Sequence, residues 1–488
     1  MRGLVLAVIA LFLLSGDTGF SVPQLLRNAA QAKNPAALLW SAAIQRNEYA
    51  QQALVTYAAE NDSTYWLNRL VKIGNADAAW VLYERAAPDE DSGKLMRLAA
   101  MGNVPDAQLA YALSVEDPEL RETWLLKSAR QDYVPAQAAL ADWYLLQQQP
   151  ENARPWLEKT ADLDAQSAFK YGRLLWESGE HAAGKGYLEK AAEQGHEMAA
   201  SLAKMIARYQ PRTFSQITPR QWPENKRCLQ RIQIFATSLS TIQRADALYQ
   251  RFQLDKRLEP LPICMQPPVW LQGDELKCND NWKRSGRLGC DIRPLSAAVK
   301  KRDFTHAVIV AKQGTANTHN GVMFLDISDA YSVFVHELAH FAGFADEYPL
   351  TKAAARRYCG REDIPNLVFD GALTYQPVTR VGQWQQLGSA GVWHAKTCES
   401  IGVNAYKPSR QVTFLEHHDS GVIPASYIRL WKAQLEDKTV HRPVYLNLFQ
   451  SFHQGQQTAD ADEWLKRYES YREVSEVEAG AAVSDVTP

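Results

Sequence analysis

The sequence lacks a surplus of either charge. Its 488 residues contain 53 lysines and arginines against 55 aspartates and glutamates, which gives a formal net charge of −2. Proteins that recognise nucleic-acid phosphates usually carry a basic surplus or a basic stripe, and this chain has neither. We therefore expect no nucleic-acid partner. The length predicts two or three globular domains, because one domain usually takes about 100 to 200 residues.

Long hydrophobic runs are equally scarce. Residues 4–14 form an apolar run of 11 residues that follows Arg2 and precedes small residues up to Ser21. A helix that spans a bilayer needs roughly 20 residues, so this pattern is typical of a cleaved signal peptide. No later stretch is long and apolar enough to cross a membrane. We predict a signal peptide at residues 1–21 and a periplasmic or secreted protein with no membrane span after cleavage.

Residues 1–227 contain no cysteine, and the six cysteines beyond them form no C-x-x-C motif. This spacing argues against a zinc ribbon or a thioredoxin-like site. An even number of cysteines in an exported protein favours disulfides instead. If each cysteine pairs with its nearest neighbour in sequence, the disulfides are Cys228–Cys264, Cys278–Cys290 and Cys359–Cys398.

Residues 22–210 are poor in β-branched residues and carry apolar positions every three or four residues, which predicts successive helices. Similar residue pairs recur at steps of 29 residues, with a longer step of 34 to Ala199: Asp77-Ala78, Asp106-Ala107, Pro135-Ala136 and Asp164-Ala165. Small residues also recur in the partner helices, at 98–100, 127–129, 159–161 and 190–192. Such positions allow paired helices to approach closely.

These repeats resemble the Sel1-like branch of the tetratricopeptide-type repeats. The resemblance implies an all-α solenoid whose surface binds a protein partner. The alternative is a helical scaffold that only packs on its neighbouring domain.

A different fold class is expected beyond residue 210. Three prolines, at 211, 219 and 223, interrupt the helical pattern. Strand patterns then occur at residues 232–235, 305–310 and 321–327, with a helical pattern at 241–255 between the first two. The sequence therefore predicts an α+β domain over residues 211–457, followed by an acidic tail at 458–488. We expect a helix around residues 464–471 of the tail and disorder around it.

The most specific motif lies in this second domain and reads His336-Glu337-x-x-His340-x-x-Gly343-x-x-Asp346. On a helix, His336 and His340 lie one turn apart on the same face, so both imidazoles can bind one Zn²⁺ ion. Glu337 can take a proton from a zinc-bound water and pass it to the leaving amine. Ser328 is expected to cap the start of the helix, and Gly343 to end it in the left-handed conformation.

This motif resembles the signature H-E-x-x-H-x-x-G-x-x-(H/D) of the metzincin metallopeptidases. The ending Asp346-Glu347-Tyr348 is more particularly similar to the bacterial IgA-peptidase-like metallopeptidases. The resemblance implies a zincin-like domain in which His336, His340 and Asp346 bind zinc and Glu337 is the general base. It also implies an edge strand that aligns the substrate backbone, and residues 321–327 directly precede the motif.

The chain departs from the metzincin pattern in one respect. Metzincins place a methionine turn beneath the zinc, but no methionine follows His340. Residues 406–415 are similar to that stretch, with Phe414 or Leu415 in place of methionine. An apolar floor can be supplied by either side chain.

Two assignments stay open at this point. The third zinc ligand is expected to be Asp346, with Glu347 or the pair His417-His418 as alternatives. A donor that stabilises the transition state alongside zinc could be Tyr406, Tyr427 or His418, whereas Tyr348 is expected to be a packing residue.

Together these features predict an exported zinc metalloendopeptidase that hydrolyses peptide bonds of a protein substrate. The alternative function is a non-catalytic exported interaction protein, in which the repeats bind a partner and the zinc site is structural.

Overall fold

The computed structural model describes residues 18–86, 90–224, 227–369 and 376–484. The chain divides into two compact units, Met1–Ala200 and Ser201–Pro488. The predicted signal peptide at residues 1–21 lies almost wholly outside the described residues. Within the described part, no helix combines the length and apolar composition needed to cross a bilayer.

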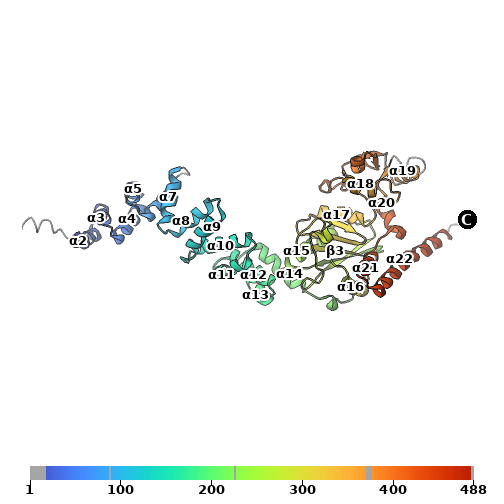
Figure 1. The fold of residues 1–488 in the computed structure, drawn as a ribbon, viewed down its shortest axis with the longest axis horizontal. Coiled ribbons are helices and arrows are strands. Elements are labelled where there is room, and N and C mark those ends of the chain that lie inside the picture. The colour runs from blue at the N-terminus through green and yellow to red at the C-terminus, as the bar shows by residue number, and fades with distance from the viewer. Residues whose placement is uncertain (1–17, 87–89, 225–226, 370–375, 485–488) are drawn as a thin grey trace, which may run out of the picture. The chain divides into compact units, whose positions relative to one another are not determined.

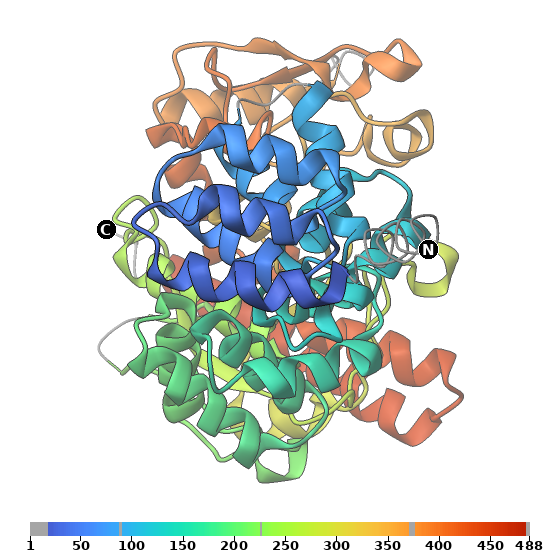
Figure 2. The same cartoon turned by 90° about the vertical axis from the view of Figure 1, so that its left-hand side faces the viewer.

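The first unit is an array of paired helices (Figures 1 and 2). Its helices are α2 (Thr18–Gln31), α3 (Ala36–Ala43), α4 (Glu48–Glu60), α5 (Thr64–Lys72), α6 (Ala76–Arg85), α7 (Glu90–Met101), α8 (Pro105–Ser114), α9 (Pro118–Ala129), α10 (Val134–Leu146), α11 (Pro150–Thr160), α12 (Ala165–Glu177), α13 (His181–Glu193) and the start of α14 (Glu197–Arg208).

The predicted repeats are confirmed by these helices. The recurring pairs lie in the first turns of α6, α8, α10 and α12, and Ala199 lies in the first turn of α14. The recurring small residues are fully buried between helices, among them Ala78, Ala99, Ala107, Ser128, Ala136, Thr160 and Ala191. The closest approach is at Gly102, where an added Cβ atom would lie 2.1 Å from Cβ of Ala76.

The boundary between the units lies inside α14, ahead of the predicted position near residue 210. The second half of α14 is bonded to α15 (Leu239–Leu254) of the second unit. Tyr209, just after α14, donates a hydrogen bond to Asp246 at 2.5 Å, and Arg208 forms an ion pair with the same carboxylate at 3.3 Å. Gln243 also donates to Ser201 at 3.2 Å. These contacts assign the end of α14 to the second unit.

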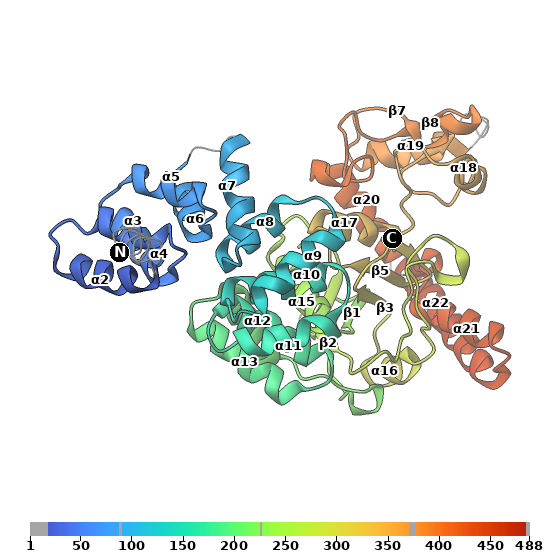
Figure 3. The ribbon, with the colours of Figure 1, turned by 60° about the vertical axis from the view of Figure 1, so that its left-hand side comes forward.

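A five-stranded sheet forms the centre of the second unit (Figure 3), in the order β2-β1-β3-β5-β4. Its strands are β1 (Gln230–Ala236), β2 (Ile263–Trp270), β3 (His306–Ala311), β4 (Asn317–His319) and β5 (Val322–Asp326). Four strands are parallel, and β4 pairs antiparallel with β5. The predicted strands correspond to β1, β3 and β5, whereas the two edge strands, β2 and β4, were not predicted.

The position of β5 corrects one expectation. Residues 321–327 were expected to supply the edge strand, but β5 lies between β3 and β4. Val322, Met323 and Leu325 of β5 are fully buried, so both faces of the strand are covered. The three polar residues of β4 form the edge instead, as is usual for the exposed rim of a sheet.

Helices cover both faces of the sheet (Figures 1 and 3). On one face, α16 (Leu295–Arg302), α21 (Val444–Gln454) and α22 (Thr458–Ser484) share a core with β1, β3 and β5. On the other, α15 and α17 (Tyr331–His340) contact the strands. A smaller region beyond α17 contains α18 (Lys352–Tyr358), α19 (Gln376–Gln386), α20 (Ala425–Glu436), β6 (Val368–Phe369), β7 (Trp393–Ala395) and β8 (Ala405–Lys407). Short 3-10 helices are η1 (Phe214–Gln216), η2 (Trp282–Arg284), η4 (Lys396–Ile401), η5 (His418–Ser420) and η6 (Lys438–Val440).

Three disulfides brace this unit, and their pairing confirms the prediction. They are Cys228–Cys264, Cys278–Cys290 and Cys359–Cys398. The first joins the approach to β1 with β2, the second closes a loop before α16, and the third joins the end of α18 to η4.

The helix expected around residues 464–471 is present, and it is longer than predicted, so the expectation of disorder in the rest of the tail is wrong for the described residues. The tail begins as α22, and its residues Ala461 and Trp464 are buried in the core beside Tyr445 of α21. The two residues lie three positions apart, so they share one face of the helix. Lys300 on α16 forms an ion pair with Glu463 at 2.7 Å. The apolar face formed by Ala461 and Trp464 therefore packs the tail helix against the core, while acidic residues lie on its outer surface.

Two buried histidines predict that this unit loses stability in mild acid. His306 is fully buried, and its Nε2 atom has no hydrogen-bond partner among the described residues. Burial holds the pKa of His306 well below its ordinary value and also lowers the pKa of His441. The unfolded chain therefore binds more protons than the folded one as the pH falls below about 6.5, and stability is lost in that range.

A His306→Phe variant tests this prediction, because phenylalanine keeps an aromatic ring beside Phe341 but does not titrate. Between about pH 6.5 and 5, we expect wild type to lose up to about 1.4 kcal/mol per pH unit relative to the variant in urea unfolding. Asp329 acts in the opposite direction, because burial raises its pKa to about 6, but it is present in both proteins. Parallel stability curves for the two proteins would contradict the prediction.

Candidate metal centre

The start of helix α17 differs from the prediction, whereas its end agrees with it. The helix begins at Tyr331 with Ala330 in the N-cap position, so Ser328 is not its cap. Ser328 is held in the preceding turn, where its N–H and its hydroxyl both donate to Asp326, at 2.7 and 2.6 Å. Gly343 follows the helix with φ of 82°, in the left-handed conformation that was predicted.

Two backbone carbonyls orient the histidines of α17. Nδ1 of His336 lies 2.9 Å from the carbonyl oxygen of Phe414, and Nδ1 of His340 lies 2.8 Å from that of Phe344. A carbonyl oxygen only accepts hydrogen bonds, so each Nδ1 carries the proton. In the neutral imidazoles, the Nε2 atoms then keep their lone pairs, which is the arrangement that metal-binding histidines usually show.

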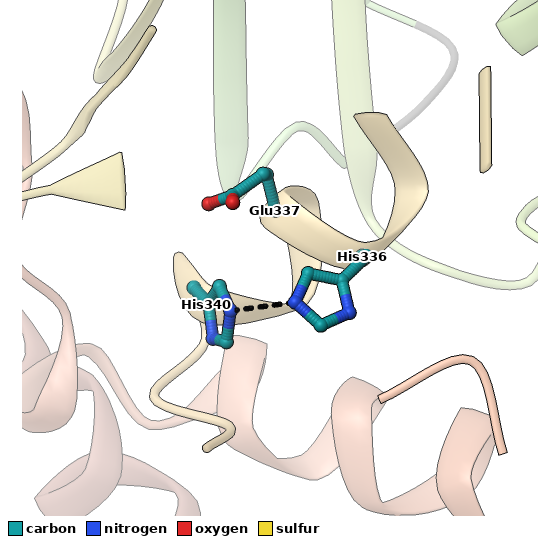
Figure 4. A group of neighbouring side chains, drawn as sticks. All are labelled: His336, Glu337 and His340. Atoms are coloured by element: carbon teal, nitrogen blue, oxygen red, sulfur yellow. Dashed lines mark hydrogen bonds between the residues drawn. The ribbon is translucent and has the colours of Figure 1, made fainter. Parts of the chain in front are cut away.

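Asp346 completes a group of three converging ligand atoms. Its Oδ1 atom lies 3.0 Å from Nε2 of His336 and 3.2 Å from Nε2 of His340, and the two Nε2 atoms are 3.2 Å apart (Figure 4 shows the two rings). A tetrahedral zinc ion with bonds near 2.0 to 2.1 Å separates its ligand atoms by roughly 3.3 Å. The three atoms therefore have the spacing that one zinc ion requires.

Electrostatics favour a cation between these residues. Three lone-pair-bearing atoms at this distance repel one another unless a proton or a metal ion lies among them. Burial alone would lower the pKa of His340, but the carboxylate of Asp346 outweighs this effect and raises the pKa to about 9. Burial alone would raise the pKa of Asp346, but the charge on His340 brings it well below its usual value. Oδ1 of Asp346 makes no hydrogen bond in the described part of the chain. The donor set therefore fits zinc.

Glu337 lies close to the two histidines. Its donor atoms and those of His336 and His340 lie within 4.8 Å of one another (Figure 4). The side chain is largely buried, yet Oε2 has no hydrogen-bond partner among the described residues. A buried carboxylate oxygen without a donor is costly, so the position calls for a proton-bearing ligand such as water.

The segment expected to replace the methionine turn lies against the histidines. Phe414 supplies the carbonyl that orients His336, and its buried ring stacks on Trp431 with centroids 5.9 Å apart. Leu415 is also fully buried, and its carbonyl accepts from the N–H of Glu347 at 3.0 Å. Phe414 thus contributes an apolar ring to the core and a backbone carbonyl that accepts a hydrogen bond from His336.

Glu347, an alternative third ligand, is occupied elsewhere. Its carboxylate is fully buried and accepts four hydrogen bonds. The donors are Tyr427 at 2.6 Å, Asn366 at 3.0 Å, Lys407 at 3.2 Å and Thr413 at 2.5 Å. The structure therefore brings Asp346, and not Glu347, to the histidines.

The remaining alternatives are also placed away from the group. His418 is bonded to Asp419 at 2.9 Å near the start of α17, and the ring of His417 stacks on that of His418. Tyr427 is buried and donates a hydrogen bond to Glu347. Tyr406 lies on β8 with its ring against that of His394. None of them belongs to the group of side chains in the described residues that could hold a metal ion.

Tyr348, expected to be a packing residue, is the tyrosine at this site. Its ring lies nearly parallel to that of His336, with centroids 6.2 Å apart, and the side chain remains partly exposed. Burial and the nearby carboxylate of Asp346 raise the pKa of its hydroxyl, which therefore stays protonated. Its position two residues after Asp346 is the sequence feature that could have predicted its place at this site.

These residues line one cavity. It has a volume of about 560 Å³, and Glu337, His340, Asp346 and Tyr348 lie on its wall. The edge strand β4 forms another part of the wall. The candidate metal-binding residues and an exposed strand edge therefore share one cleft.

No protein-family model and no curated protein matches this chain. Two crystal structures are similar to part of it. One is a protective antigen of uropathogenic Escherichia coli strains that displays an SLR fold, with 20% identity and a TM-score of 0.30. The other is a Sel1 repeat protein from Oxalobacter formigenes, with 21% identity and a TM-score of 0.28. Each match covers 36% of this chain. The matched part is 44% of the Escherichia coli antigen and 60% of the Oxalobacter protein, so this chain spans less than two thirds of either. Both are Sel1-repeat proteins, the class that the repeats resemble.

Proposed function

We propose that this protein is an exported zinc metalloendopeptidase of the metzincin type, with a repeat array that binds its protein substrate or a protein partner. The observation that carries the proposal is the convergence of His336, His340 and Asp346 at separations of 3.0 to 3.2 Å. Export is supported by the three disulfides, which are typical of oxidising compartments.

Each group in the cleft has a distinct task. Zinc held by His336, His340 and Asp346 supplies Lewis acidity toward the scissile carbonyl. Glu337 takes a proton from the attacking water through its unpartnered Oε2 and later delivers it to the leaving amine. Tyr348 donates its hydroxyl proton in a hydrogen bond to the oxyanion that develops during attack.

The strand β4 positions the substrate. As the antiparallel edge of the sheet, it offers its outer side to an extended peptide, which adds as a further strand. Asn317 and Thr318 of β4 line the same cavity as Glu337. The scissile bond of a peptide paired with β4 is thereby brought to the metal ligands.

A Glu337→Gln variant tests the proposal. We expect wild type to cleave an unstructured peptide mixture in the presence of stoichiometric zinc. The variant should keep its zinc and lose about 10² to 10⁴-fold in kcat/KM, because only the proton transfer is removed. Zinc content by elemental analysis and new peptide termini by mass spectrometry give the two readouts.

The matched control is Glu436→Gln, at an exposed glutamate on the last turn of α20. It should change neither readout. If wild type holds zinc but cleaves neither peptides nor proteins of its native compartment, the structural zinc site of an interaction protein becomes the better explanation.

A further inference from the structure

A second hollow adjoins the metal centre along the same edge strand. Its volume is about 880 Å³. The two hollows share lining residues: Arg287, Asn317, Thr318, His319, Ala354 and Tyr358. A peptide that extends from the metal centre along β4 therefore enters this second hollow.

The wall of this hollow is strongly basic. Lys283, Arg287, Arg293 and Arg357 line it, against a single carboxylate, Asp291. Arg293 donates two hydrogen bonds to that carboxylate, from Nη2 to Oδ2 at 2.6 Å and from Nε to Oδ1 at 2.9 Å. Three cations thus remain without an acidic partner on the wall, in a chain whose formal net charge is −2.

These three cations are free to bind an anion. Lys283 bonds to a neutral group, Oε1 of Gln454, at 2.8 Å. Arg287 and Arg357 are exposed, and neither forms an ion pair with a carboxylate in the described part of the chain. Charges of one sign held together repel one another, which makes a bound anion favourable.

The segments that carry the cations are cross-linked by disulfides. Lys283 and Arg287 lie in the loop closed by Cys278–Cys290, and the N–H of Trp282 donates to the carbonyl of Arg287 at 2.9 Å. Arg357 lies on α18, which ends at the Cys359–Cys398 disulfide. The basic wall is therefore positioned before any ligand arrives, which lowers the entropic cost of binding.

We propose that this basic hollow selects peptide substrates that carry aspartate or glutamate side chains on one side of the scissile bond. The inference rests on the proposed peptidase function and names its substrate class. A peptide fits better than a small anion, because the hollow has room for several side chains and runs along the strand that pairs with the substrate backbone.

A peptide library with aspartate, asparagine or lysine at each position tests the inference. Wild type should prefer aspartate to asparagine by about tenfold at positions on one side of the cleaved bond. The double variant Arg287→Glu/Arg357→Glu should reverse this preference toward lysine. The preference should also weaken between about 50 and 500 mM salt, since exposed charges are screened.

The matched control is Arg356→Glu, at the exposed residue next to Arg357 that does not line the hollow. It should leave the preference unchanged. Cleavage without a charge preference, or a preference that Arg356→Glu and the double variant alter equally, overturns this inference and leaves the proposed function intact.

A binding measurement separates this inference from turnover. The Glu337→Gln protein should bind a fluorescent peptide that contains consecutive aspartates at least tenfold more tightly than its asparagine counterpart, and the double variant should abolish the difference. Selective binding with no cleavage by wild type retains the anionic ligand class and overturns the proposed function alone. Equal affinities for the two peptides overturn the inference.

Discussion

Asp346→Ala should yield a largely metal-free protein with no detectable hydrolysis. The carboxylate is one of three ligand atoms within 3.2 Å of one another, and two histidines alone hold zinc poorly. Loss of a partner outside the ligand set usually costs about 10 to 100-fold in metal affinity, so loss of a ligand should cost more. Zinc titration with a competing chromophoric chelator measures the change.

Asp346→His is the matched variant for this prediction. Imidazole serves at the same position in the metzincin signature, so some zinc binding should return. His417→Ala should keep its zinc, because His417 lies away from the ligand atoms. Full zinc retention in Asp346→Ala, or zinc loss in His417→Ala, would contradict the assignment of Asp346 as the third zinc ligand.

The sequence could predict those parts of the site that depend on local spacing. Two histidines four residues apart on a helix must share a face, and Gly343 ends the helix because it tolerates positive φ. Asp346 follows from the length of that turn. The disulfides also join cysteines that are consecutive along the chain, at separations of 12, 36 and 39 residues. Each of these features depends on neighbours in sequence.

Features that depend on distant residues were not predictable in the same way. β4 consists of three polar residues, a pattern that does not by itself predict a strand. It is a strand because it pairs with β5. Pro267 and Pro268 interrupt the pattern of β2, and prolines are tolerated there because β2 is the other edge. The sequence favoured Tyr427 as the proton donor and Tyr348 as a packing residue, and only the structure shows that Tyr427 is buried with its hydroxyl bonded to Glu347.

In the tail, the sequence indicated the helix around residues 464–471 but not its full length or its packing on the core. Its acidic residues and its small residues near the C-terminus favour disorder on average. Ala461, Trp464 and Tyr468 nevertheless recur at helical spacing and pack on the core. Because Tyr468 also lines the cavity of the metal centre, the tail contributes to the cleft.

Glu347→Ala should destabilise the second unit by about 3 to 5 kcal/mol while leaving the zinc ligands in place. The variant leaves Tyr427, Asn366 and Thr413 without their buried acceptor, and each unsatisfied group costs about 1 to 3 kcal/mol. Lys407 keeps its ion pair with Glu416, which limits the loss. Urea unfolding followed by tryptophan fluorescence measures the change.

Zinc binding distinguishes this structural role from a ligand role. The Glu347 carboxylate accepts from the hydroxyl of Thr413, next to Phe414, so its loss should loosen the segment that orients His336 and weaken zinc affinity by about 10 to 100-fold. Glu416→Gln, at a partly exposed carboxylate on the same lysine, should have a smaller effect on stability because Glu347 still neutralises Lys407. A Glu347→Ala protein with wild-type stability and no zinc would identify Glu347 as the ligand in place of Asp346.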